Sequence, residues 1–209
     1  IKGLKWILVA SAATLIAMPS GAQAGKPAKI KRGDQAAGGW EQIHLQGPIE
    51  VTLPDGSARV VEPSCSGGPI ADAPPTANNP FGLRPGTTDF SFFVRRGNPN
   101  RLLFGFDGGG ACWDALTCIG TPLSDGGSVY QIEIDETPEV LAMRGGLFDG
   151  GNPENPYANY TQIYVPYCSG DIHWGSKDTT YTLPGAGISW LIHHRGTDNF
   201  LAVLDWLQD

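Results

Sequence analysis

Three consecutive glycines follow an apolar run near the middle of the chain. Residues 102–106 (LLFGF) lead through Asp107 into residues 108–110 (GGG). Glycine lets the backbone turn sharply and leaves its N–H groups unshielded by a side chain. N–H groups held in this way can stabilise the negative charge of a tetrahedral intermediate in acyl transfer. The pattern indicates either an oxyanion-stabilising turn or a tight turn that only ends a strand, and no G-x-x-x-x-G-K-[ST] follows to favour a phosphate loop.

Aromatic and titratable residues lie beside this turn and in a second segment, residues 165–175 (VPYCSGDIHWG). Trp113 and Trp174 could stack on sugar rings, line an acyl pocket or pack beneath the loops. Asp171 and His173 are two positions apart, so on an extended segment their side chains would share a face. Together they could orient a substrate, or they could form a structural hydrogen bond within the loop.

Other nucleophile and base candidates are weaker. No G-x-S-x-G element occurs, and Ser66, the nearest approach to one, lacks the leading glycine. His193 and His194 are adjacent, so on a strand they would point to opposite faces and could not easily bind one metal ion. We interpret one of them as a core histidine or a histidine at the start of a helix. Asp107 and Asp114 flank the glycines, but spacing alone does not define an acid–base pair.

The N-terminal segment has the pattern of a signal peptide, predicted over residues 1–24. Lys2 and Lys5 precede an apolar run at 6–18, and Ala22-Gln23-Ala24 supplies small residues for cleavage. The run is shorter than the roughly 20 residues that span a bilayer. We therefore expect a secreted or periplasmic protein with no membrane attachment after cleavage.

The predicted export would place the cysteines in an oxidising compartment. The four are Cys65, Cys112, Cys118 and Cys168. An even number in an oxidising compartment suggests two disulfides, for which three pairings exist. Sequence distance favours Cys112–Cys118, which leaves Cys65–Cys168. No C-x-x-C or H-x-x-x-H spacing occurs, so we expect no metal site.

Composition narrows the class of protein. The 209 residues carry 14 Lys and Arg against 21 Asp and Glu, a formal charge of −7, with only 17% charged residues. Nucleic-acid partners require clustered basic residues, so they are not expected. With 41% hydrophobic residues the chain can bury a core. The 29 glycines and 17 prolines favour turns and long loops over a helical bundle.

Several elements are predicted to position these residues. Alternation and β-branched or aromatic content predict short strands, and Phe200, Val203, Leu204 and Leu207 form the stripe of an amphipathic helix. We expect residues 97–100 to form a hairpin between two of the strands. Residues 25–39 are predicted to be a flexible lead-in and 63–85 a loop. The predicted strands cover 49–53, 89–95, 101–106, 163–167 and 189–192. Strands separated by loops with a late helix indicate an α/β protein.

Four motifs resemble the pectin acetylesterase and Notum family of secreted serine carboxylesterases. They are FDGGGACWD at 106–114, NPY at 155–157, VPYCSGDIHWG at 165–175 and HHRGTDNFLAVLDWL at 193–207. The resemblance covers roughly residues 60–209. It implies an α/β-hydrolase fold, of which residues 40–209 would be the N-terminal part only, and a Ser-His-Asp ester hydrolase that uses no cofactor.

By the same resemblance, Gly109 and Gly110 supply the oxyanion N–H groups, and the disulfides are the two named above. The family's nucleophile elbow and the rest of its triad would lie beyond Asp209, so we expect the 209 residues alone to be inactive. The expected substrate is an O-acetylated polysaccharide such as pectin, or another ester. The alternatives are a non-catalytic carbohydrate-binding or relic protein and a Notum-like deacylase of lipid acyl groups.

Overall fold

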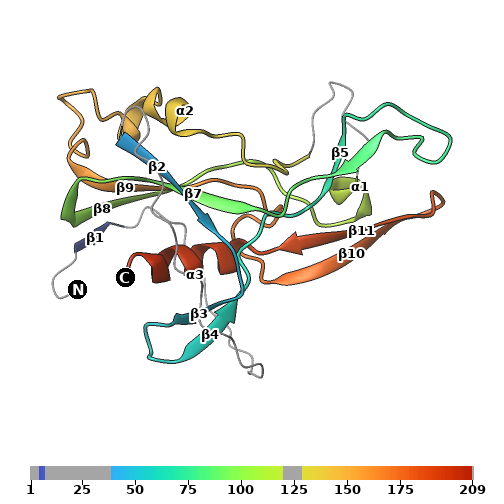
Figure 1. Ribbon diagram of the computed structural model, residues 1–209, viewed down its shortest axis with the longest axis horizontal. Coiled ribbons are helices and arrows are strands. Elements are labelled where there is room, and N and C mark those ends of the chain that lie inside the picture. The colour runs from blue at the N-terminus through green and yellow to red at the C-terminus, as the bar shows by residue number, and fades with distance from the viewer. Residues whose placement is uncertain (1–4, 8–38, 120–128, 209) are drawn as a thin grey trace.

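A five-stranded sheet forms the centre of the protein (Figure 1). The computed structural model describes residues 5–7, 39–119 and 129–208. In spatial order, the sheet contains β1 (Lys5–Ile7), β8 (Asn98–Phe106), β9 (Tyr160–Val165), β7 (Phe90–Arg95) and β2 (Trp40–Leu45). The β1–β8 and β8–β9 pairs are parallel, whereas β9–β7 and β7–β2 are antiparallel. The sheet is therefore mixed.

The strand order contradicts the predicted hairpin at 97–100. β7 and β8 are consecutive in the chain, but β9 lies between them and hydrogen-bonds to both. Gly97 allows this departure, because a Cβ there would collide with the backbone of Asn159 and Tyr160 at the start of β9. β9 is therefore an inner strand of the sheet, and its Ile163 and Val165 are fully buried.

The remaining strands form three separate two-stranded antiparallel sheets. The predicted strand at 49–53 is confirmed, and residues 54–56 form the turn that follows it. The three pairs are β3 (Ile49–Thr52) with β4 (Ala58–Val61), β5 (Pro69–Ala71) with β6 (Leu83–Pro85), and β10 (Lys177–Leu183) with β11 (Ile188–His194). The β5–β6 pair lies inside the segment predicted to be a loop.

Helices are few and mostly short in the described residues. They are α1 (Ala115–Cys118), α2 (Pro138–Ala142), the 3-10 turn η2 (Gly146–Phe148) and α3 (Gly196–Trp206). The side chain of Asp114 caps α1 by accepting from the backbone N–H of Thr117. The amphipathic stripe near the C-terminus correctly predicted α3.

The predicted α/β-hydrolase fold is wrong. The structure is mostly β, with 37% strand and 15% helix, and its small sheets are antiparallel, whereas that fold has a helix-rich arrangement around a central parallel sheet. The segments that would have to form crossover helices are rich in Gly, Pro and Asn, which disfavour helix interiors. The connection from β8 to β9 accordingly contains only α1, α2 and η2 in its described part.

The two faces of the sheet are covered by different helices, as Figure 1 shows for α2 and α3. Phe92 of β7 contacts Trp206 of α3, with ring centroids 5.1 Å apart. Phe93, the next residue, points to the other face and belongs to a cluster with Leu141 of α2. Because both faces are covered, β7 is apolar nearly throughout.

Two disulfides tie the loops to this frame. Cys65 pairs with Cys168 just after β9, and Cys112 pairs with Cys118 of α1. Disulfides of this kind are typical of proteins from oxidising compartments. They fit an extracellular location.

The predicted signal peptide and lead-in lie largely outside the described residues. Residues 5–7 are the exception, because they form β1 and pair in parallel with residues 101–103 of β8. Cleavage after residue 24 therefore remains a prediction, and it would remove one edge strand of the sheet. None of the helices described here has the length and apolarity needed to cross a membrane.

Candidate functional site

The glycine turn leaves the carboxyl end of β8, between two other loops. Asp107 donates its backbone N–H to the carbonyl of Val165 at 2.9 Å, which holds the start of the turn against β9. Gln131 donates its backbone N–H to the carbonyl of Gly109 at 2.6 Å. The ends of adjacent parallel strands, where loops converge, are a common location for sites.

The turn requires glycine at two of its three positions. Gly110 has a φ of +79°, and a Cβ there would collide with the carbonyl oxygen of Val129. A Cβ on Gly109 would collide with the ring of Tyr167. Gly108 has open space around it, so an added methyl group meets nothing there. Among the described residues, the backbone N–H groups of Gly109 and Gly110 donate no hydrogen bond.

The second loop, which follows β9, is organised around the carboxylate of Asp171. This carboxylate accepts hydrogen bonds from the hydroxyl of Ser169 (2.6 Å) and from the backbone N–H groups of His173 (3.0 Å), Gly175 (2.8 Å) and Gly196 (2.7 Å). An ionised carboxylate makes strong hydrogen bonds of this kind. Asp171 thus shapes its own loop and anchors the start of α3. These contacts correspond to the structural alternative for this residue rather than to a contact with substrate.

His173 joins the two loops. Its Nε2 lies 3.0 Å from the backbone carbonyl oxygen of Asp107, and its ring contacts the rings of Phe106 and Tyr167. Burial lowers the pKa of His173, so the ring is neutral near pH 7. The segment is not extended here, because Ile172 and His173 have φ values of +53° and +64°. The two side chains therefore interact through the backbone of the loop rather than from a shared strand face.

The two tryptophans are exposed. Trp113 is 67% accessible and Trp174 is 54% accessible, so neither packs beneath the loops. Trp113 follows Cys112, whose N–H donates to Gly170 of the second loop at 2.9 Å. The N–H of Trp174 donates to the carbonyl of Asp171 at 3.1 Å. The backbone of each tryptophan is thus held in place, while more than half of each residue is exposed to solvent.

Sequence reasoning missed Glu136. Its side chain is 5% exposed, and it lies with the Asp107 carboxylate around the guanidinium of Arg144, which is 3.4 Å from each. Burial, together with the neighbouring Asp107, raises the pKa of Glu136 to about 8. Burial also raises the pKa of Tyr164, whose ring lies under Arg144. No local motif marks Glu136, so the sequence carried no signal for it.

The adjacent histidines occupy opposite faces of β11, as predicted. His194 is buried, with Nδ1 3.1 Å from the carbonyl oxygen of Ser169 and Nε2 3.0 Å from the hydroxyl of Tyr181. His193 Nδ1 lies 2.8 Å from Asp178 on β10. Ser66 is fully buried, and its hydroxyl lies 3.0 Å from the hydroxyl of Tyr130 and accepts from an N–H of its own loop. Neither contact would activate it as a nucleophile.

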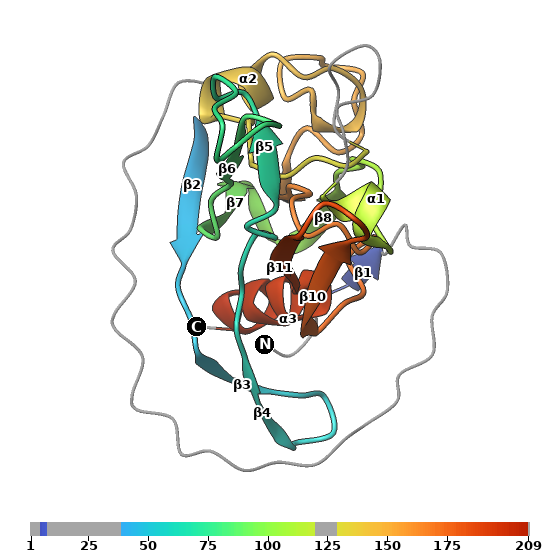
Figure 2. The same cartoon turned by 90° about the vertical axis from the view of Figure 1, so that its right-hand side faces the viewer.

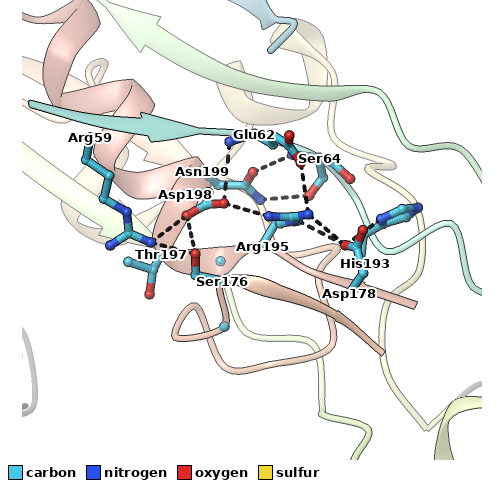
Figure 3. Close-up of polar contacts among 12 residues, drawn as sticks. Arg59, Glu62, Ser64, Ser176, Asp178, His193, Arg195, Thr197, Asp198 and Asn199 are labelled. Carbon is cyan, nitrogen blue, oxygen red and sulfur yellow. Dashed lines mark hydrogen bonds and ion pairs between the residues drawn. The ribbon is translucent and has the colours of Figure 1, made fainter. Parts of the chain in front are cut away.

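A polar network joins α3 to the β3–β4 sheet and to the second loop (Figure 3). Its centre is Asp198, which is 2% exposed. The carboxylate of Asp198 accepts from Arg59 (3.1 Å), the Ser176 hydroxyl (2.6 Å) and Arg195 (3.1 Å). Next to it, the Asn199 amide both donates to and accepts from the backbone of Ser64. Residues of the HHRGTDNF motif thus hold α3 in place.

One group of potential metal ligands occurs among the described residues. Atoms of Cys112, Cys118 and His194 lie within 4.8 Å of one another. The two sulfurs are bonded to each other, so neither is the thiolate that zinc binds. Both ring nitrogens of His194 also have protein partners.

No family model, curated protein or solved structure matches this chain. The resemblance of residues 106–114 and 165–175 to pectin acetylesterases therefore stays an expectation. The structure adds that these two motifs, separated by fifty residues, lie side by side.

Proposed function

We propose that these residues belong to a secreted carboxylic ester hydrolase that removes acyl groups from an acylated polysaccharide. The observation that carries this proposal is the pair of backbone N–H groups at Gly109 and Gly110, which have no hydrogen-bond partner among the described residues. They lie in a turn whose shape excludes side chains at both positions. An oxyanion site requires fixed backbone donors of this kind.

In the proposed reaction, a serine hydroxyl attacks the ester carbonyl while a histidine takes its proton and an aspartate orients that histidine. The carbonyl oxygen becomes an oxyanion, which accepts hydrogen bonds from Gly109 and Gly110. Collapse of the tetrahedral intermediate expels the sugar alcohol, which receives the proton from the histidine. Water then hydrolyses the acyl-serine. No G-x-S-x-G element occurs in the sequence, so in this proposal the triad is supplied by residues outside these 209.

The proposal predicts a large loss of activity in Gly109→Ala. The added methyl group collides with Tyr167 and displaces the amide, and the loss of one oxyanion donor lowers kcat by about 100-fold or more. Acetate release from acetylated pectin by the complete protein measures this effect.

Gly108→Ala is the matched control, because its methyl group meets no atom, and we expect it to keep near-normal kcat. Thermal unfolding of both variants separates misplacement of the amide from loss of the fold. A folded Gly109→Ala variant with unchanged kcat would contradict the oxyanion role. We expect the 209-residue chain to release no acetate, and release that Ser66→Ala abolishes would place the nucleophile within it.

A second candidate function is polysaccharide binding without hydrolysis, which the exposure of Trp113 and Trp174 favours. Aromatic rings stack on the apolar faces of sugars, and each contact contributes about 1 kcal/mol. We expect Trp113→Ala and Trp174→Ala each to weaken binding to pectin about fivefold. Phe81→Ala, at an exposed aromatic residue between β5 and β6, serves as the control. Affinity electrophoresis in pectin-containing gels measures the change, and equal retardation of all three variants would exclude this role.

A further inference from the structure

A pair of carboxyl groups lies directly behind the glycine turn. Asp107 is the first residue after β8, and Glu136 comes just before Thr137, the N-cap residue of α2. The side chain of Glu136 is almost fully buried, and that of Asp107 is largely buried. The two residues are brought together across the sheet face that α2 covers.

A single guanidinium group, that of Arg144, contacts both carboxyl groups. Nη2 of Arg144 lies 3.4 Å from Asp107 Oδ2 and 3.4 Å from Glu136 Oε1. The remaining group facing the pair from β9 is the neutral Tyr164 hydroxyl, and Asp135 adds a further negative charge nearby. A second buried negative charge would therefore be uncompensated. Two carboxyl groups in such a site share one proton.

The proton belongs on Glu136. Its Oε2 is buried with no donor beside it among the described residues, so the ionised form would leave this oxygen unsatisfied. The protonated carboxyl group can instead donate a hydrogen bond to the Asp107 carboxylate. The pKa of Asp107 is lowered in spite of burial, because the neighbouring Glu136, the Tyr164 hydroxyl and Arg144 all favour its ionised form. At neutral pH the pair is thus a protonated Glu136 beside an ionised Asp107.

Asp107 fixes the first amide of the glycine turn. Its Oδ1 accepts the backbone N–H of Gly108 at 3.0 Å, and its own carbonyl oxygen lies 3.0 Å from His173 Nε2. The Asp107 carboxylate thus contributes to the position of Gly108, which leads directly into Gly109 and Gly110. A second charge on Glu136 would push this carboxylate away from its place.

We propose that Glu136 is a positioning residue for the glycine turn: its protonated carboxyl group holds the Asp107 carboxylate against the Gly108 N–H, and this arrangement aims the amides of Gly109 and Gly110. The inference rests on the proposed ester hydrolase function. It assigns a role to a residue that no motif marks.

The structural part of the inference is tested without any substrate. Backbone amide resonances of residues 108–110 are followed in the ¹⁵N-labelled chain between pH 6 and 10. We expect them to shift with a midpoint near pH 8, and the shift to vanish in Glu136→Gln, which keeps an N–H donor but cannot ionise. Glu139→Gln, at an exposed residue of α2, should titrate like the unaltered chain. Persistence of the titration in Glu136→Gln, or its absence from the unaltered chain, overturns the inference.

The functional part is tested in the complete protein by the pH profile of ester hydrolysis. We expect kcat to fall at least tenfold between pH 7 and 10, to stay level in Glu136→Gln and to be low throughout in Glu136→Ala, with KM unchanged. If Glu136→Gln is active and shows the same pH profile as the unaltered protein, the positioning role is wrong. Normal amide titration without esterase activity at any pH would instead reject the proposed function and leave the amide result standing.

Discussion

Replacing both cysteines of the Cys65–Cys168 disulfide with alanine is expected to lower the free energy of unfolding by about 5 kcal/mol. The bond joins residues 103 positions apart, so it removes much of the conformational freedom of the unfolded chain. It also fastens the loop before β5 to the loop after β9, where Ser66 donates its N–H to Cys168 at 2.8 Å. Urea unfolding of the purified double variant measures the loss.

The matched control is the double alanine variant of Cys112 and Cys118. That bond closes a loop of only six positions, so the same entropy argument gives about 2 kcal/mol. Both pairs are buried and have the same Cα–Cα distance of 4.9 Å, which makes the comparison one of loop length. Equal losses in the two double variants would show that loop closure is not the dominant contribution.

Asp198→Ala is expected to cost about 3 kcal/mol, because it removes the shared partner of two arginines from a buried site, although Arg195 keeps Glu62 and Asp178 as partners. The side chain of Arg195 is itself mostly buried, and the hydroxyl of Ser176 loses its acceptor (Figure 3). Thermal and urea unfolding measure the effect. We also expect faster proteolysis of the β3–β4 pair, which Arg59 fastens to α3.

An exposed ion pair on the same molecule provides the control. Asp72 contacts Arg84 at 2.8 Å, but about half of its side chain is accessible to water. Exposed pairs contribute roughly 1 kcal/mol or less, so Asp72→Ala should leave stability nearly unchanged. A loss in Asp198→Ala no larger than in Asp72→Ala would refute the central role of Asp198 in the network.

Figure 2 shows the β3–β4 pair apart from the β5–β6 and β10–β11 pairs, and all three pairs are separate from the five-stranded sheet. Local sequence patterns explain only part of this arrangement. Residues 54–56 (PDG) form the turn between β3 and β4, and a tight turn of this kind depends on a few adjacent residues. No local signal located β9 between β7 and β8, since that placement depends on contacts between residues about 70 positions apart.

In the candidate site, too, some features could be predicted from the sequence and others could not. The glycine turn and the 165–175 segment were recognisable from residue types, because backbone freedom and aromatic character belong to the residues themselves. Whether Asp171 served a substrate or its own loop was open until the positive φ values of Ile172 and His173 were known. The raised pKa of Glu136 could not be predicted from the sequence, since burial and the approach of Asp107 arise only in the folded chain.

Local chemistry in the sequence correctly predicted the strand and helix around 49–53 and 200–207 and marked the turn at the three glycines, and sequence distance favoured the cysteine pairing that the structure shows. Only the folded chain decided the sheet order, the mainly β architecture and the meeting of Asp107, Glu136 and Arg144 behind that turn. The reason is physical: turns and amphipathic stripes depend on neighbours in sequence, whereas strand order, burial and the sharing of a proton depend on residues that meet only after long loops have closed.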